Sequence, residues 1–124
     1  MTFWTPDEAN WQKEETGPFF ATMWGNPKKG PHAGLVKFTR GTTMPLHTHT
    51  ADHVGVLVSG TVIIGDETGT DRTLTPGTTL NVPGMVKHTT RCAPEADCVI
   101  FAYVSGKDTT KPVDIAVKDK TASN

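Results

Sequence analysis

Three of the chain's five histidines lie within seven residues, as His47, His49 and His53 of the segment 44–53. In an extended segment successive side chains point to opposite faces, so parity places all three imidazoles on one face. Crowded imidazoles lose hydration and repel one another once protonated, whereas a divalent transition metal accepts their lone pairs. The spacing therefore predicts a metal site.

A further ligand must come from elsewhere, because one extended segment cannot surround a metal. His88 lies in a strand-like stretch after the Pro83-Gly84 turn, and we expect it to be the fourth member of the site. The fifth histidine, His32, lies in the turn-rich segment 28–34, where we expect it to be exposed.

The elements that position these histidines are predicted to be strands along almost the whole chain. The segments rich in β-branched and aromatic residues, which we expect to be strands, are 33–39, 53–65, 72–75, 78–82, 86–91 and 98–106. Gly, Pro, Asn and Asp mark turns between them at 66–71, 75–77, 82–84 and 93–97. This pattern is typical of an all-β sandwich or barrel. Residues 5–15 carry a helix-start signal at Thr5 and Pro6, and predict one short helix or an irregular arm.

Residues 41–60 resemble the first sequence motif of the cupin superfamily. That motif consists of Gly, five residues, His-x-His, three or four residues, Glu, six residues and Gly. Every spacing matches here, and His53 stands where the motif has glutamate.

Residues 77–92 resemble the second cupin motif, which consists of Gly, five residues, Pro-x-Gly, two residues, His, three residues and Asn. Pro83 and His88 match, whereas the glycine stands one place early at Gly84 and Cys92 replaces the asparagine. Together the two motifs cover most of the predicted barrel.

The resemblance implies an all-β fold, the double-stranded β-helix or jelly-roll barrel of the cupins, with a short N-terminal arm or helix. We expect residues 1–30 to pack on the barrel as arm and strands, residues 31–112 to form the barrel, and residues 113–124 to add one strand and then fray.

The resemblance also implies that His47, His49, His53 and His88 hold one divalent transition metal inside the barrel, as in the all-histidine branch of the superfamily. Fe(II) and Zn(II) are the preferred ions, with Mn, Ni and Cu as alternatives. Four neutral ligands leave the metal its full charge, which favours the divalent state and a stronger Lewis acid.

Several residues are expected to line the pocket beside the metal. Gly55 shares the face of His53, where it either leaves room for a small bidentate ligand or marks a bulge or bend. Thr90 and Cys92 share the strand face of His88. We expect Thr90 to place its hydroxyl behind the ligand and Cys92 to form an apolar wall. The full expected set is Phe38, Met44, Gly55, Leu57, Thr90, Cys92, Phe101 and Tyr103. No catalytic residue is assigned, because Asp52 and Asp66 fall on the opposite face or in turns.

The two cysteines, Cys92 and Cys98, flank the turn 93–97. Reduced thiols in a cytosolic protein are the preferred interpretation, and a disulfide across a hairpin is the alternative.

Composition limits the partners. Twelve Lys and Arg against thirteen Asp and Glu give a net charge of −1 without a basic stripe, so nucleic acid is not expected. No run of 18 apolar residues and no leader pattern occurs, so we expect no membrane partner and a cytoplasmic location, or a periplasmic one if a leader was removed. We expect a small-molecule substrate and a homodimer, whose contact covers the apolar side chains Trp4, Trp11, Phe19 and Phe20.

Three classes of function fit these features, and whether the protein is an enzyme stays open. The first, preferred by a small margin, is a non-haem metal-dependent dioxygenase acting on a small enolisable or dicarbonyl compound. The second is a redox-silent zinc enzyme, a cyclase, isomerase or lyase. The third is a non-catalytic cupin that binds a metal or a small molecule.

Overall fold

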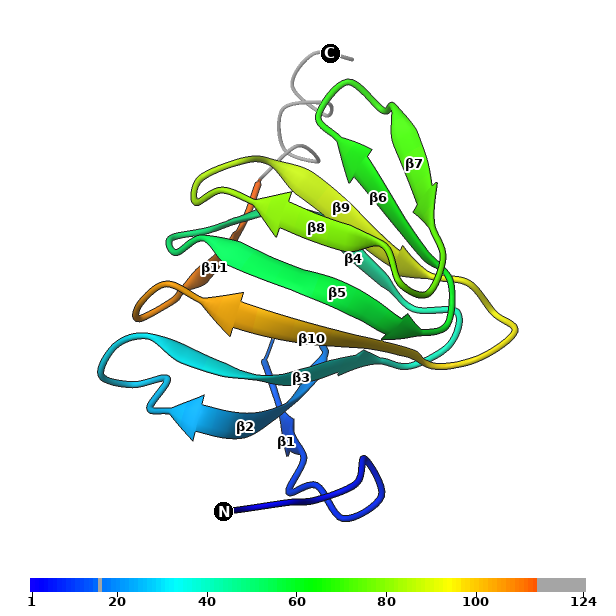
Figure 1. Ribbon diagram of the computed structural model, residues 1–124. Helices are drawn as coiled ribbons and strands as arrows, with labels where there is room; N and C mark the ends of the chain where they lie inside the picture. Colours follow the sequence, from blue (N-terminus) through cyan, green and yellow to red (C-terminus); the bar gives the residue numbers. More distant parts are fainter. Residues whose placement is uncertain (16, 114–124) are drawn as a thin grey trace.

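The computed structural model describes residues 1–15 and 17–113, and within them the only regular elements are β-strands. They form two antiparallel sheets (Figure 1). The six-stranded sheet contains, in spatial order, β1 (Gln12–Lys13), β2 (Phe19–Gly25), β3 (His32–Phe38), β10 (Cys98–Val104), β5 (His53–Ser59) and β8 (Thr79–Val82). The five-stranded sheet contains β11 (Thr110–Pro112), β4 (Thr43–His49), β9 (His88–Cys92), β6 (Val62–Asp66) and β7 (Asp71–Leu74).

The chain passes repeatedly from one sheet to the other, which closes the two sheets around a common interior. Consecutive strands β3 and β4 lie in different sheets, and so do β4 and β5, β5 and β6, and β7 and β8. The all-β prediction is therefore confirmed. The expected strand 53–65 is divided into β5 and β6 at Gly60, whose φ of 84° suits glycine in a tight turn.

The core between the sheets fills one end of this interior. It is built from inward-facing residues of both sheets, namely Leu57, Val62, Leu74, Cys92, Cys98, Ile100 and Ala102. Leu57, Val62 and Cys98 are completely buried. The packed end leaves the opposite end of the interior to other residues.

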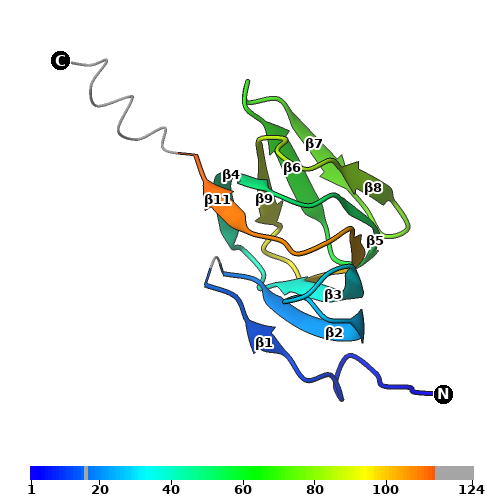
Figure 2. The ribbon, with the colours of Figure 1, turned by 90° about the vertical axis from the view of Figure 1, so that its left-hand side faces the viewer.

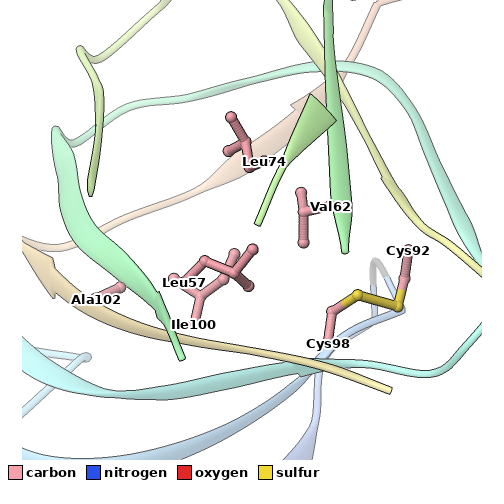
Figure 3. Close-up of a cluster of buried hydrophobic side chains, with 7 residues drawn as sticks. All are labelled: Leu57, Val62, Leu74, Cys92, Cys98, Ile100 and Ala102. Carbon is pink, nitrogen blue, oxygen red and sulfur yellow. A yellow bond between two sulfur atoms is a disulfide. The ribbon is translucent and has the colours of Figure 1, made fainter. Parts of the chain in front are cut away.

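A disulfide between Cys92 and Cys98 lies in this core, with the Cα atoms 5.9 Å apart (Figure 3). The preference for two reduced thiols is therefore wrong. The turn 93–97 returns the chain from the end of β9 to the start of β10, so the two inward-facing sulfur atoms meet where the sheets approach each other. The disulfide covalently joins the five-stranded sheet to the six-stranded sheet.

The N-terminal segment is an irregular arm that leads into the edge of the six-stranded sheet (Figure 2). A single turn follows Thr5, with the Glu8 amide donating to the Thr5 carbonyl oxygen at 2.9 Å, and no helix forms in it. The Lys37 Nζ atom lies over the Trp11 ring, 4.5 Å from its centroid, and is 5.3 Å from the centroid of the Phe19 ring. These contacts fasten the arm to the sheet.

The expected strand in 113–124 lies outside the described residues apart from Val113, whose amide donates to the Leu46 carbonyl oxygen. The described part of the chain also contains no helix with the length and apolar character of a membrane span.

We expect the replacement of both Cys92 and Cys98 by alanine to lower the free energy of unfolding by about 2 kcal/mol, because the disulfide closes only a short loop in the unfolded chain. Urea denaturation of the variant and the native protein measures this difference. Adding a thiol reductant should lower the melting temperature of the native protein and leave that of the variant unchanged. An equal response of both proteins would contradict the disulfide.

Candidate metal centre

The predicted histidines come together at the open end of the interior, opposite the disulfide. His47 and His49 lie in β4, at its C-terminal end, while His53 begins β5 and His88 begins β9. His47 and His88 are direct partners across the β4–β9 pair. The prediction that residues 47–53 form one extended segment is wrong, because the chain bends at 50–52 and crosses to the other sheet. This crossing brings His53 to the site.

The imidazole rings are packed closely. The centroid of His47 lies 4.9 Å from that of His49 and 4.2 Å from that of His88, and the His49 and His53 centroids are 4.2 Å apart. One ring nitrogen each of His47, His49 and His88 lies within 4.8 Å of the others, so that these three could hold a metal ion. A second group with the same spacing shares His49 and adds His53 and Asp108.

Main-chain carbonyls set the orientation of two of these rings. His47 Nδ1 donates to the Pro45 carbonyl oxygen at 2.6 Å, and His88 Nδ1 donates to that of Val86 at 2.9 Å. Each bond places the hydrogen on Nδ1 and leaves a lone pair on Nε2. His47 Nε2 is buried and has no hydrogen-bond partner. An orphaned buried acceptor of this kind is costly, and a metal ion would satisfy it, so the donor set fits a divalent transition metal.

Burial keeps these imidazoles neutral. Loss of hydration, with a smaller contribution from the neighbouring histidines, lowers the pKa of His47 to about 4, although the bond to Pro45 acts in the opposite direction. Burial likewise lowers the pKa of His88. Both rings are thus unprotonated at pH 7, which is the form that binds metals.

Asp108, in the loop between β10 and β11, completes the centre and was not predicted. Its Oδ2 lies 2.8 Å from His53 Nε2 and 3.2 Å from His49 Nδ1. Burial alone would raise the pKa of Asp108, but hydrogen bonds from His49, His53 and the Ala51 amide hold it well below its usual range. The site therefore contains an ionised carboxylate.

A cavity of about 610 Å³ opens onto the histidines. Among the predicted pocket residues, Phe38, Met44 and Thr90 line it, as do His47, His49, His53 and His88. Further apolar walls come from Phe20, Val36, Ile64, Leu80 and Ile100. Its volume is within the range of small-molecule sites.

The other predicted pocket residues lie elsewhere. Phe101 and Tyr103 are on the outer face of β10, because Cys98, Ile100, Ala102 and Val104 take the buried positions of that strand. Leu57 and Cys92 were also expected to line the pocket, and this is wrong. Both side chains point inward as predicted, but they pack in the core at the opposite end.

Gly55 allows β5 and β10 to pack closely and leaves no room beside the histidines. A Cβ atom there would collide with the carbonyl oxygen of Phe101 and lie 3.1 Å from the Ala102 Cα. Gly55 pairs in regular register with Ala102 and Leu80, and the register shift between β5 and β10 lies further along, where Ile100 faces Leu57 and Val99 faces Ser59. The expected bulge is therefore not at Gly55, and the glycine instead permits the close approach of β10.

His32 is buried, contrary to the expectation of exposure. It begins β3, where its ring faces the cavity at 4% exposure, and its Nδ1 bonds the Gly30 carbonyl oxygen at 2.9 Å. It belongs to neither candidate metal group.

Comparison with known proteins establishes the fold. No protein-family model matches the chain, and no curated protein matches it. The polyketide cyclase RemF from Streptomyces resistomycificus matches with a TM-score of 0.77 at 12% identity, over 91% of this chain and 85% of that one. A cupin-2 domain from Rhodospirillum rubrum matches with a TM-score of 0.71 at 13% identity, over 100% and 87%. The fold is therefore the double-stranded β-helix of the cupins.

A third solved structure has a closer sequence. KdgF from Halomonas sp. is 29% identical to this chain, with a TM-score of 0.66, over 85% of this chain and 93% of that one.

We expect the metal-free protein to lose stability as the pH falls from 7 to 4. Because the pKa of His47 falls to about 4 in the folded state, the unfolded chain binds a proton in this range that the folded one does not. The free energy of unfolding is therefore highest above about pH 6.5. At pH 4, the protonation of His47 in the unfolded chain alone lowers it by about 3 kcal/mol. Urea denaturation across this range should show a smaller slope for His47→Asn. Identical slopes would contradict the neutral buried ring.

Proposed function

We propose that this protein is a metal-dependent enzyme that acts on a small carbonyl compound without changing the oxidation state of the metal, as a cyclase, isomerase or lyase does. The observation that carries the proposal is the group of His47, His49 and His88, which faces a cavity of substrate size with the buried His47 Nε2 unpartnered. A site of this kind suits a bound metal with a small molecule beside it.

His47, His49 and His88 would hold the ion, with His53 within reach of the same centre. A bound divalent ion supplies Lewis-acid polarisation of a carbonyl oxygen. Phe38, Met44 and Ile100 offer an apolar wall for a carbon skeleton and limit the access of water. Asp108 offers a charged acceptor that remains ionised beside the substrate space.

The presence of Asp108 changes the balance between the two classes of enzyme. Sequence reasoning preferred the dioxygenase because no carboxylate was expected near the histidines, which weakened ordinary acid–base chemistry. Asp108 places a carboxylate there, with its Oδ2 within 3.2 Å of two imidazoles. Because its low pKa makes it a weak base, its contribution to acid–base chemistry is to orient those imidazoles. The name of RemF, a polyketide cyclase with the same fold, agrees with redox-silent chemistry.

The first test follows enolisation, a step that cyclisation, isomerisation and elimination next to a carbonyl have in common. We expect the zinc-loaded protein to accelerate deuterium exchange at the α-carbons of small ketones and keto acids in D2O, measured by proton NMR. Metal-free protein and the zinc-treated His88→Ala variant should show only the background rate. If no carbonyl compound exchanges, while the Fe(II)-loaded protein consumes oxygen with acetylacetone, the dioxygenase hypothesis replaces this proposal.

The second test addresses the ligands. We expect His47→Ala and His88→Ala each to weaken Zn(II) binding by more than about 100-fold, because loss of a partner behind a ligand alone costs 10–100-fold. Competition with a chromophoric chelator measures the affinity. His32→Ala is the matched control, since His32 is equally buried and makes the same bond to a carbonyl two residues earlier, but lies outside the metal groups. Native affinity in the His47 and His88 variants would overturn the metal site.

A further inference from the structure

We propose that the groove between β7 and β8 extends the substrate site, and that Arg72 in this groove binds a carboxylate at the far end of the substrate. The substrate is then an oxo acid, with its carbonyl group at the histidines and its carboxylate at Arg72. The inference rests on the proposed function for the carbonyl end of the substrate, and it adds the carboxylate end.

The groove lies where the two sheets part. β7 and β8 are the end strands of the five-stranded and six-stranded sheets, and they lie on the same side of the barrel (Figure 2). A cavity of about 570 Å³ is lined by both strands, with apolar walls from Ile64, Leu74, Leu80 and Val82. This volume, like that of the histidine cavity, is within the range of small-molecule sites.

The groove and the histidine cavity have common walls. Ile64, Leu80, Val82 and His88 line both of them. Because His88 is one of the proposed metal ligands, the groove begins directly beside the metal centre. The three apolar side chains of this common wall are half-buried. A substrate bound at the histidines therefore reaches the groove by extending between the two sheets toward β7.

The strand register places Arg72 along that path. Arg72 is opposite Ile64 in β6, and Ile64 is opposite Thr90 in β9. Thr90 lies two residues after His88, so the Cα atoms of Arg72 and His88 are two strand spacings and two residues apart, roughly 12 Å. Arg72 points to the same face of β7 as Leu74, which is buried in the core. The guanidinium thus belongs to the inner face of the sheet, at a distance that a short carbon chain can bridge.

Arg72 differs from the other two arginines of the chain in its lack of a carboxylate partner. Arg40 pairs with Asp97 at 3.2 Å. Arg91 pairs with Asp71 at 2.8 Å. In the part of the chain that the structure describes, no carboxylate lies within 4.0 Å of the Arg72 guanidinium. A guanidinium with free donors recognises a carboxylate through two parallel hydrogen bonds, so an anionic ligand suits this position.

The other charged side chains along the groove already have partners. Lys87 pairs with Glu67 at 3.3 Å. The Asp66 carboxylate accepts hydrogen bonds from main-chain amides of its own turn, and Asp71 has the arginine partner given above. Among the described residues that line the groove, Arg72 is therefore the charged group left for a ligand. Its single positive charge matches a carboxylate better than a phosphate ester, which carries nearly two negative charges.

The experiment compares oxo acids with their uncharged amides in the zinc-loaded protein. The probes are 4-oxopentanoate, 5-oxohexanoate and 6-oxoheptanoate, and proton NMR follows deuterium exchange beside the carbonyl group. We expect kcat/KM for at least one acid to exceed that of its amide by about tenfold or more, because only the acid forms charge-assisted hydrogen bonds to Arg72. Equal values in every acid–amide pair would overturn the inference.

Variants identify the source of this preference. Because Arg72 is exposed on an edge strand, its replacement leaves the core intact. In Arg72→Gln we expect KM for the preferred acid to rise about tenfold and kcat to stay within about twofold, since the carbonyl end of the substrate is untouched. Arg72→Lys should retain part of the preference for the acid. A native preference in Arg72→Gln would contradict the role of this residue.

Arg91→Gln is the matched control. Arg91 follows the inward-facing Thr90 in β9, so the variant removes the same charge from the outer face of the same sheet. We expect it to retain the native KM for the preferred acid. A rise in KM equal to that of Arg72→Gln would show a general effect of net charge and overturn the assignment to the groove.

A binding measurement separates this inference from the proposed function. The acids and amides are titrated into the zinc-loaded protein, and the Arg72 Nε–H signal is observed by proton–nitrogen NMR. If an acid but not its amide shifts this signal, while no carbonyl compound exchanges deuterium, the groove is supported and the proposed function is overturned. If acid and amide exchange equally and the signal does not move, the proposed function is supported and the groove is overturned. If neither exchange nor a shift occurs, both are overturned.

Discussion

The buried lone pairs of the histidine cluster are the constraint on which the functional end of this barrel depends. Imidazoles with centroids 4.2–5.3 Å apart cannot all be protonated, and away from water they cannot all find protein partners. Two rings satisfy one nitrogen on a main-chain carbonyl, and a third has Asp108 and Thr110 beside its Nδ1. What remains is a set of inward nitrogens that a metal ion can satisfy.

The barrel keeps the histidine cluster apart from the hydrophobic core that stabilises the fold. The core around Leu57 and Val62, with the disulfide, occupies one end of the interior, and the histidines the other. A well-packed core does not tolerate an orphaned polar atom, so a site with unsatisfied nitrogens needs an interior of its own. The same strands supply both ends: β9 begins with His88 and ends with Cys92.

The sequence predicted the strands and the histidines better than it predicted the surroundings of the site. His-x-His in β4 follows from alternation within a strand, and His88 follows from its place in a strand-like stretch after the Pro83-Gly84 turn. Phe101 and Tyr103 were misplaced because both faces of β10 are apolar, so that alternation gave no indication of the inward face. Asp108 was missed because it lies 55 residues after His53, in a polar loop whose composition resembles any surface turn. The pairing of β11 with β4 brings that loop to the site, a contact between strands far apart in the sequence.

The two halves of the centre are encoded differently. His47 and His88 take their orientation from main-chain carbonyl groups. Any residue in the same backbone conformation supplies such a carbonyl, so the side chains around these two rings can change without loss of the bonds. His49 and His53 instead contact side chains: Asp108 lies beside both rings, and the Thr110 hydroxyl lies beside His49. A single substitution of Asp108 would therefore disturb the surroundings of two rings and retain the part of the site that the main chain defines.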